Sequence, residues 1–454
     1  MTPVTKACVN FAYNLKFVDI PLVASEQMKK YIFDLICCSV AGTRAPEVEI
    51  LQNLFKTSSD LEGILPYGRS TPTSPEIAAI INGAAGHALE MDDSDRTGLS
   101  HPGVMVITPA LLTAAHYHST GKTLITACVA GYEVMLRVGT ALGLDHYSIW
   151  HTTGTTGGLG AAISCGKLLK LSEKELTDAF GNAGTLACGL WEFNKTYAMS
   201  KLLHVGMGVS HGLMCARLAQ KGFTGAECIL EGTQGLFAGF RSKDLDLSVF
   251  EDFGKFWRAA GVTFKPYPCC RHTHGGIDCG LRLHKLNLPA SQIARIRIET
   301  YKAAYDVVAS NTCHRTKEGK FSLPYTVVSA MLDGEITENT FSADSIETPL
   351  KQQLLTLCTV EVAEDIQGVH PHHENCRVTV ELRNGKSFTE FVFDPLGEPE
   401  NPMDWNALAA KGRQLLSHCS DEEFDELLHL IQKLDELDDC EKLYRLVQNY
   451  SCRQ

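Results

Sequence analysis

The sequence is short of positive charge and of long apolar runs, and each shortage excludes a class of protein. Its 454 residues hold 41 Lys and Arg against 53 Asp and Glu, giving a net charge of -12. Because nucleic-acid phosphates require a basic surface, we expect no nucleic-acid partner. The most apolar region, residues 107–144, is interrupted by Lys122, Glu133 and Arg137. This pattern favours buried helices over a membrane span, so we expect no membrane partner.

Secretion and nucleotide-binding signals are also missing. None of the 17 cysteines forms a Cys-x-x-Cys pair, and residues 1–7 lack a basic segment followed by an apolar core. We therefore expect a reducing, cytoplasmic location in which the cysteines stay reduced. The string Gly157-Gly158-Leu159-Gly160 has no β-rich run before it and is not a full G-x-G-x-x-G, so no dinucleotide loop is predicted.

The chain is long enough for two domains with separate cores. Apolar residues follow helical spacing up to residue 261 and again after Pro402, whereas strand patterns occur between them. We predict a mainly α fold, with a large all-helical domain of residues 1–261 and 404–454 and a smaller inserted α+β lid domain of residues 262–403. The main β signal is a hairpin of residues 377–382 and 387–393 around Asn384-Gly385.

Residues 83–103 concentrate acidic, basic and helix-breaking residues. Ser74 and Pro75 are start signals for a helix that we expect to run to about Asp92. One face of this helix is apolar, and the other is small and polar, which is typical of a cleft lining. The small and polar residues along and after this face are Gly83, His87, Glu90, Asp92, Asp93, Ser94, Asp95 and His101.

Three further clusters carry basic groups that suit an anionic ligand. They are Trp150-His151-Thr152, Ser200-Lys201-Leu202-Leu203-His204, and residues 264–274 with Lys265, Cys269, Cys270, His272 and His274. A lysine on an apolar helix face either extends to solvent or neutralises a bound anion. The acidic run lacks a paired histidine at ligand spacing, and the Cys-Cys-x-His-x-His string cannot supply a tetrahedral zinc site alone. We predict no metal and keep a zinc-binding module as an alternative.

A serine hydrolase is a further alternative, because Gly208-Val209-Ser210-His211-Gly212 matches G-x-S-x-G. A nucleophile elbow needs a buried strand before the serine and β/α alternation around it. The helical first half offers neither, so Ser210 is expected to be a helix-packing residue.

Taken together, the motifs resemble the MmgE/PrpD superfamily along nearly the whole chain. The motifs are Gly86-His87-Ala88-Leu89-Glu90-Met91-Asp92-Asp93 with His101-Pro102, His151 before a Gly-rich helix, Ser200-Lys201-Leu202-Leu203-His204-Val205-Gly206, Lys265-Pro266-Tyr267-Pro268-Cys269-Cys270 with His274, and Lys320-Phe321-Ser322-Leu323-Pro324-Tyr325 before Met331. The superfamily includes enzymes of the 2-methylcitrate dehydratase, cis-aconitate decarboxylase and iminodisuccinate epimerase types.

The resemblance implies a helical domain made from both chain ends, an α+β lid, a homodimer and a cofactor-free active site in the cleft between domains. His101 is implied as the proton-transfer residue. The other catalytic positions implied are Glu90, Ser94, His151 and Tyr325, and the substrate-binding positions are Asp93, Lys201, Lys265 and His274. Some members have a histidine five residues after the lid lysine, where this chain has Cys270; the Cys269-Cys270 pair is closer to the fungal cis-aconitate decarboxylase type.

Reactions of this superfamily make or break a C–H bond beside a carboxylate. They need a base with a pKa near neutrality and cations that hold the carboxylates and the developing enediolate charge. His101 suits the first need, and Lys201 and Lys265 suit the second. We therefore predict a cofactor-independent lyase that decarboxylates or dehydrates a small di- or tricarboxylate, with an epimerase or isomerase of the same superfamily as the alternative.

Overall fold

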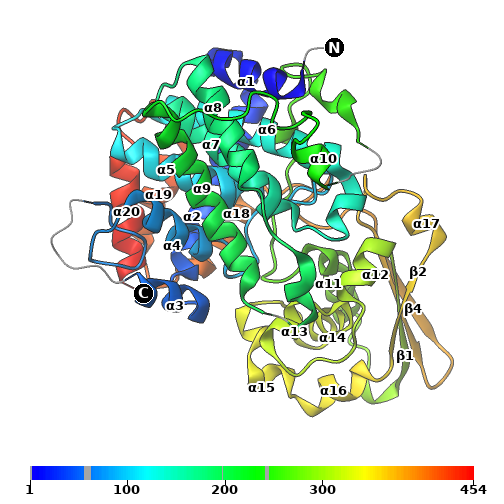
Figure 1. Cartoon of the computed structure of the whole chain (residues 1–454). Helices are drawn as coiled ribbons and strands as arrows, with labels where there is room; N and C mark the ends of the chain where they lie inside the picture. The colour runs from blue at the N-terminus through cyan, green and yellow to red at the C-terminus, as the bar shows by residue number, and fades with distance from the viewer. Residues whose placement is uncertain (1–2, 56–62, 197, 241–244, 454) are drawn as a thin grey trace. The chain divides into compact units, whose positions relative to one another are not determined.

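The computed structural model describes residues 3–55, 63–196, 198–240 and 245–453, and the chain divides into two compact units (Figure 1). The helical unit comprises Met1–Val262 and Asp404–Gln454, and the mixed unit comprises Thr263–Met403. Helices dominate the described residues and strands occur only in one small sheet, so the mainly α prediction is confirmed. The lid role of the mixed unit stays a prediction.

The helical unit takes its helices from both ends of the chain. They are α1 (Val4–Asn14), α2 (Leu22–Gly42), α3 (Pro46–Leu54), α4 (Pro75–His87), α5 (Pro102–His116), α6 (Gly121–Tyr147), α7 (Thr152–Leu168), α8 (Glu173–Thr185), α9 (Ser200–Gln220), α10 (Leu236–Phe240), α18 (Trp405–Leu415), α19 (Asp421–Gln432) and α20 (Glu441–Cys452). Residues 223–235 contain no helix, and α10 begins at Leu236, after Gly232 and Gly235 close a turn.

Helix α7 lies among α5, α6, α8 and α9 and forms the centre of the helical unit (Figure 1). Its sequence is rich in glycine because neighbouring backbones approach closely there. A Cβ atom on Gly212 of α9 would lie 2.3 Å from the Cβ of Ala161 on α7. Glycine therefore permits close packing of α7 against α9.

Helix α6 is long and apolar enough to cross a membrane by length and composition alone. In the described structure 94% of its most apolar window is buried inside the protein, as expected for a core helix. Buried Arg137 and Glu133 on α6 form an ion pair of 3.2 Å, which compensates the charges inside the core.

The C-terminal helices pack against N-terminal ones: α18, α19 and α20 all contact α2, and α20 also contacts α5 (Figure 1). A buried ion pair of 2.6 Å joins Lys411 of α18 to Asp34 of α2. The same Lys411 ammonium donates a hydrogen bond of 2.7 Å to the carbonyl of Met91. The end of the chain therefore holds the loop that follows α4.

The mixed unit contains a four-stranded sheet of order β2-β1-β3-β4. Strands β1 (Ile293–Thr300) and β2 (Cys358–Val362) are parallel, and β3 (Cys376–Leu382) is antiparallel to β1 and to β4 (Ser387–Val392). The predicted hairpin is confirmed, with Gly385 at a φ of 83° in its turn. The helices of this unit are α11 (His274–His284), α12 (Lys302–Val308), α13 (Thr316–Lys320), α14 (Leu323–Asp333), α15 (Ala343–Ile346), α16 (Pro349–Leu355) and α17 (Glu364–Gln367).

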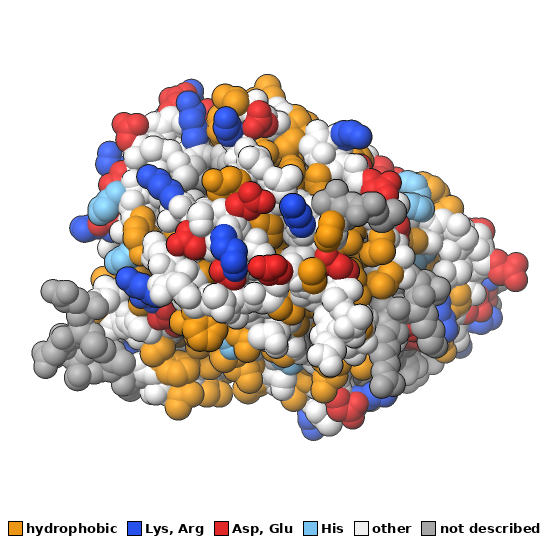
Figure 2. Space-filling model, turned by 45° about the horizontal axis from the view of Figure 1, so that its top comes forward, with side chains coloured by type: hydrophobic (Ala, Val, Ile, Leu, Met, Phe, Trp, Pro, Cys, Tyr) orange, Lys and Arg blue, Asp and Glu red, His pale blue; other side chains and the backbone are white. Residues whose placement is uncertain are grey.

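On the face drawn in Figure 2, Lys and Arg side chains lie singly among acidic and apolar ones. They do not gather into a basic patch among the described residues of that face.

Candidate functional site

The acidic residues singled out in the sequence lie on a turn and loop between α4 and α5. Ser74 caps α4 by accepting a hydrogen bond from the backbone of Ile77, and Pro75 is its first residue, as predicted. The helix ends at His87, however, and Glu90 has a left-handed φ of 60°. The prediction of a helix to about Asp92 is therefore wrong, because a right-handed helix cannot continue through that conformation. Glu90 and Ser94 belong to the loop and not to a helical face.

Asp92 lies between two histidines. The Nδ1 atom of His87 is 2.8 Å from Oδ1 and 2.9 Å from Oδ2 of Asp92. The Nδ1 atom of His101 is 3.5 Å from Oδ2 of the same carboxylate. Asp92 and His87 are fully buried, and the His101 side chain is 13% exposed. One buried carboxylate therefore faces two imidazoles.

The tautomer of His101 follows from a second contact. Its Nδ1 atom lies 2.7 Å from the backbone carbonyl oxygen of Asp93. Because a carbonyl only accepts, Nδ1 must carry a hydrogen, and Nε2 is the nitrogen that can gain or lose a proton. The backbone N–H of His101 donates to Oγ1 of Thr153 at 3.1 Å, and Pro102 begins α5. The imidazole is therefore held at its Nδ1 edge.

Asp93 is anchored through both carboxylate oxygens. Oδ1 accepts from the backbone N–H of Gly103 at 2.8 Å, and Oδ2 accepts from the Tyr132 hydroxyl at 2.7 Å. Burial raises the pKa of Asp93 to about 8, with the charge of nearby Asp92 acting in the same direction. A Cβ atom on Gly103 would lie 2.7 Å from Oδ1. These contacts favour a structural role, and substrate binding by Asp93 stays a prediction.

Glu90 and Lys201, predicted separately, form an ion pair. The ammonium of Lys201 on α9 lies 2.6 Å from Oε1 and 2.7 Å from Oε2 of Glu90. The two side chains are 10% and 11% exposed. An anionic substrate that reaches Lys201 must therefore share this cation with Glu90. Ser94, also predicted as catalytic, is half-buried on the same loop.

His151 is the cap residue before α7 and lies in an aromatic setting. Its ring is 5.0 Å from that of Trp191 and 5.6 Å from that of His204, between ring centres. The Nδ1 atoms of His151 and His204 are 3.4 Å apart. Burial, together with the charge of Lys201, lowers the pKa of His151 well below its usual value. His151 is thus a neutral imidazole near pH 7, suited to hydrogen bonding more than to holding a carboxylate by charge.

The remaining predicted residues belong to the mixed unit. The Nη1 group of Arg271 lies 3.0 Å from Nδ1 of His274, and a guanidinium only donates, so Nδ1 accepts and Nε2 carries the hydrogen. The Tyr325 hydroxyl donates to the carbonyl of Thr340 inside this unit. Lys265 lies near Cys269. Burial raises the pKa of the Cys269 thiol, and the positive charge of Lys265 offsets part of that rise. Roles for Lys265, His274 and Tyr325 in the reaction stay predictions.

Sequence reasoning assigned no role to Asp92 or to three further residues that complete this network. His87 was placed on the polar face of α4 without a function, and the short spacing from His87 to Asp92 is the only local signal for their contact. Tyr132 lies inside the apolar run of α6, and nothing in that run points to Asp93. His204 follows Lys201 on α9 and was not linked to His151.

The donor atoms of His87, Asp92 and His101 lie within 4.8 Å of one another, a spacing that a cation could also use. In the structure the Nδ1 atoms of both histidines face oxygen acceptors, so Nδ1 carries the hydrogen and only Nε2 could bind a metal. The contacts that the structure shows are those of a hydrogen-bonded network. Among the described residues the cysteines and histidines of 269–274 do not gather at ligand spacing, so the zinc-module alternative gains no support.

Ser210 lies in the middle of α9, with Gly208 and Gly212 packed toward α7. The described chain before it is helix and turn, without a strand leading to the serine. A nucleophile elbow requires that strand-to-helix turn, so the serine hydrolase alternative is wrong.

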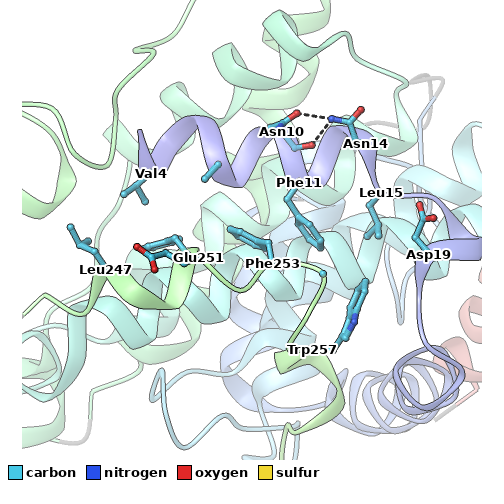
Figure 3. Close-up of a pocket in the computed structure, with 13 residues that line it drawn as sticks. Val4, Asn10, Phe11, Asn14, Leu15, Asp19, Leu247, Glu251, Phe253 and Trp257 are labelled. Atoms are coloured by element: carbon cyan, nitrogen blue, oxygen red, sulfur yellow. Dashed lines mark hydrogen bonds between the residues drawn. The ribbon is translucent and has the colours of Figure 1, made fainter. Parts of the chain in front are cut away.

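A cavity of about 580 Å³ lies elsewhere in the helical unit, between α1 and residues 247–257. Figure 3 shows the rings of Phe11, Phe253 and Trp257 at its wall, with Asp19 and Glu251 nearer its ends. Its described lining contains no Lys, Arg or His. Two carboxylates and no cation make it unsuited to a polycarboxylate, so the chemistry is assigned to the loop after α4 and not to this cavity.

Comparison with known proteins identifies a family and several relatives that match along nearly the whole chain. The MmgE/PrpD N-terminal domain matches residues 6–248, and the MmgE/PrpD C-terminal domain matches residues 267–436. The cis-aconitate decarboxylase of Aspergillus terreus is 27% identical over 98% of this chain and 96% of its own length. The proteins of that name from Mus musculus and Homo sapiens are 26% and 24% identical, over 99% of this chain and 94% and 95% of their own lengths.

The similarity to these three cis-aconitate decarboxylases extends along nearly the whole of this chain and of theirs. It confirms the predicted enzyme class, a lyase. The N-terminal match alone spans residues 6–248, more than half of the sequence. The chain belongs to the MmgE/PrpD family.

Proposed function

We propose that this protein is a cofactor-independent decarboxylase of a small unsaturated tricarboxylate of the cis-aconitate type. His101 delivers the proton that replaces the departing carboxylate. The observation that carries the proposal is the imidazole of His101, which is held at Nδ1 by the Asp93 carbonyl and leaves Nε2 for proton transfer. The names of the full-length relatives support the choice of substrate.

In the proposed reaction, the bond from carbon to one carboxylate breaks and carbon dioxide leaves. The electron pair moves into the carbon framework beside a second carboxylate, where it forms an enediolate. The Nε2–H of the His101 imidazolium then protonates carbon, and the ring becomes neutral. Asp92, 3.5 Å from Nδ1, favours the imidazolium that must be present before this step.

Cations hold the remaining carboxylates in this proposal. Lys201 binds one of them while it stays paired with Glu90 at 2.6 Å, and Lys265 is the second predicted cation. A positioned cation is worth more in a site sheltered from water than in solution. Neutral His151 donates a hydrogen bond to substrate rather than a charge.

The test is incubation of the purified protein with cis-aconitate, 2-methylcitrate and citrate in deuterated water, followed by proton NMR. The expected result is loss of carbon dioxide from cis-aconitate, with deuterium at the carbon that is protonated. Exchange without net reaction would support the epimerase or isomerase alternative. His116→Ala, at the exposed end of α5, is the matched control for His101→Ala at its start and should react normally.

The homodimer implied by the family resemblance and the cytoplasmic location expected from the cysteines and the N-terminal residues are part of this proposal. Sedimentation of the purified protein should give a mass close to twice 49.7 kDa. A monomer that is fully active would remove the dimer from it.

A further inference from the structure

We propose that His87 is a positioning residue for the reaction, which holds the Asp92 carboxylate in the orientation that supports the protonated form of His101. The proposal rests on the proposed function, because it takes His101 as the proton donor. It adds His87 and Asp92 to the residues predicted from the sequence.

The contact geometry gives His87 control over Asp92. Its Nδ1 atom is almost equally close to the two carboxylate oxygens, at 2.8 and 2.9 Å. A donor placed between two oxygens fixes the rotation of the carboxylate, and therefore the place of Oδ2. That oxygen is the one 3.5 Å from Nδ1 of His101. The rings of His87 and His101 are 4.6 Å apart at 64°, so the three side chains form one packed group.

The backbone explains why Asp92 needs such a partner. His87 is the last residue of α4, whose end is packed in the core: a Cβ atom on Gly86 would lie 3.0 Å from Ser39 and Val104. Asp92 instead follows the left-handed turn at Glu90. The hydrogen bond from Lys411 to the carbonyl of Met91 holds the backbone beside it. His87 therefore links a loop carboxylate to a rigid helix end.

His87 acts through Asp92 and not on the substrate. Its side chain is fully buried, and the Nε2 atom is 3.9 Å from Oε1 of Glu90, which is itself paired with Lys201. The other charged or titratable groups around this pair of histidines are Asp93 with Tyr132, His151, His204 and Lys201. Replacement of His87 should thus lower kcat and leave KM nearly unchanged.

The first experiment compares His87→Leu, His87→Asn and Asp92→Asn under the same conditions. Leucine fills the buried space but cannot donate, whereas asparagine offers a side-chain N–H close to the position of Nδ1. The His87→Leu variant should lose about 10²-fold in kcat, within the range for acid–base catalysis, with KM within about twofold. The His87→Asn variant should recover at least about tenfold of that loss, since it restores the donor. His146→Leu removes another buried imidazole, whose Nε2 bonds Thr155 at 2.9 Å, and serves as the matched control.

The second experiment does not depend on any substrate. NMR of protein labelled with ¹⁵N-histidine follows the titration of the His101 ring, assigned by its loss in His101→Ala. Asp92→Asn should move the titration midpoint down by about one pH unit, as expected for loss of a nearby opposite charge. His87→Leu should move it in the same direction, because Oδ2 of Asp92 is no longer held beside Nδ1 of His101, and His87→Asn should move it less. If the wild-type protein turned over none of the acids tested, the proposed function would fail while this result still decided the role of His87.

Three outcomes would overturn the proposal. The first is a kcat of His87→Leu within about threefold of wild type together with an unchanged His101 titration midpoint; a factor of three is small against the ~10²-fold effect expected of acid–base catalysis. The second is an effect of His87→Leu that appears in KM instead of kcat. The third is equal activity of the His87→Leu and His87→Asn variants. If His87→Leu fails to fold, the comparison of His87→Asn with Asp92→Asn decides: the first must keep more activity than the second.

Discussion

Removal of the Lys201 ammonium tests the buried ion pair with Glu90. Lys201→Met keeps most of the side-chain volume but leaves a carboxylate that is 11% exposed without its cation at 2.6 Å. Breaking a buried pair from one side typically costs about 3–5 kcal/mol. Because both side chains keep some contact with water, we expect a smaller loss, about 2–3 kcal/mol in the free energy of unfolding. The same variant should raise KM for a carboxylate substrate.

The assay is urea unfolding followed by tryptophan fluorescence. All four tryptophans, Trp150, Trp191, Trp257 and Trp405, belong to the helical unit, so the signal reports the unit that contains the pair. The double variant Glu90→Gln/Lys201→Met should recover part of the loss, with a coupling energy of about 1–3 kcal/mol. Strictly additive effects of the two single variants would refute the ion pair as a stabilising contact.

Three further predictions address charge, metal and substrate binding. Burial raises the pKa of Asp93 from 3.8 to about 8 in the folded protein. The free energy of unfolding should therefore fall as the pH rises between these values, by up to about 1.4 kcal/mol per pH unit from this group. Asp93→Asn should lose that slope, and a variant with the wild-type slope in urea titrations at pH 5 and 7 would contradict the pKa shift. Turnover should survive dialysis against a chelator, and a complete loss restored by a divalent ion would show that the reaction needs a metal, for which His87, Asp92 and His101 are candidate ligands. Lys265→Met should raise KM for a tricarboxylate with a smaller change in kcat, and an unchanged KM would remove Lys265 from substrate binding.

Local signals in the sequence were enough to predict where elements begin. Ser74 with Pro75 at α4 and Asn384-Gly385 in the β3–β4 hairpin both occur where the pattern predicted them. Each depends on backbone groups only a few residues away. The end of α4 was predicted wrongly, because apolar spacing continues to Met91 while the backbone turns at Glu90.

The sequence singled out candidate site residues, but it could not show which of them lie together. Glu90 and Lys201 are 111 positions apart, and Asp93 and Tyr132 are 39 apart. Such pairs are set by how α4, α6 and α9 pack, which no local spacing encodes. Conversely, Ser210 matched a short motif that lacks its structural context, since it lies inside α9.

The most direct test of the central claim is one turnover of cis-aconitate in deuterated water by wild-type protein and by folded His101→Ala, with deuterium in the product read by proton NMR. Loss of a positioned acid typically lowers the rate by about 10²–10⁴-fold. The wild-type enzyme should therefore release carbon dioxide and place one deuterium on carbon, and His101→Ala should slow that step by such a factor with its fold intact. A folded His101→Ala variant with near-normal kcat would contradict the assignment of His101 as the proton donor.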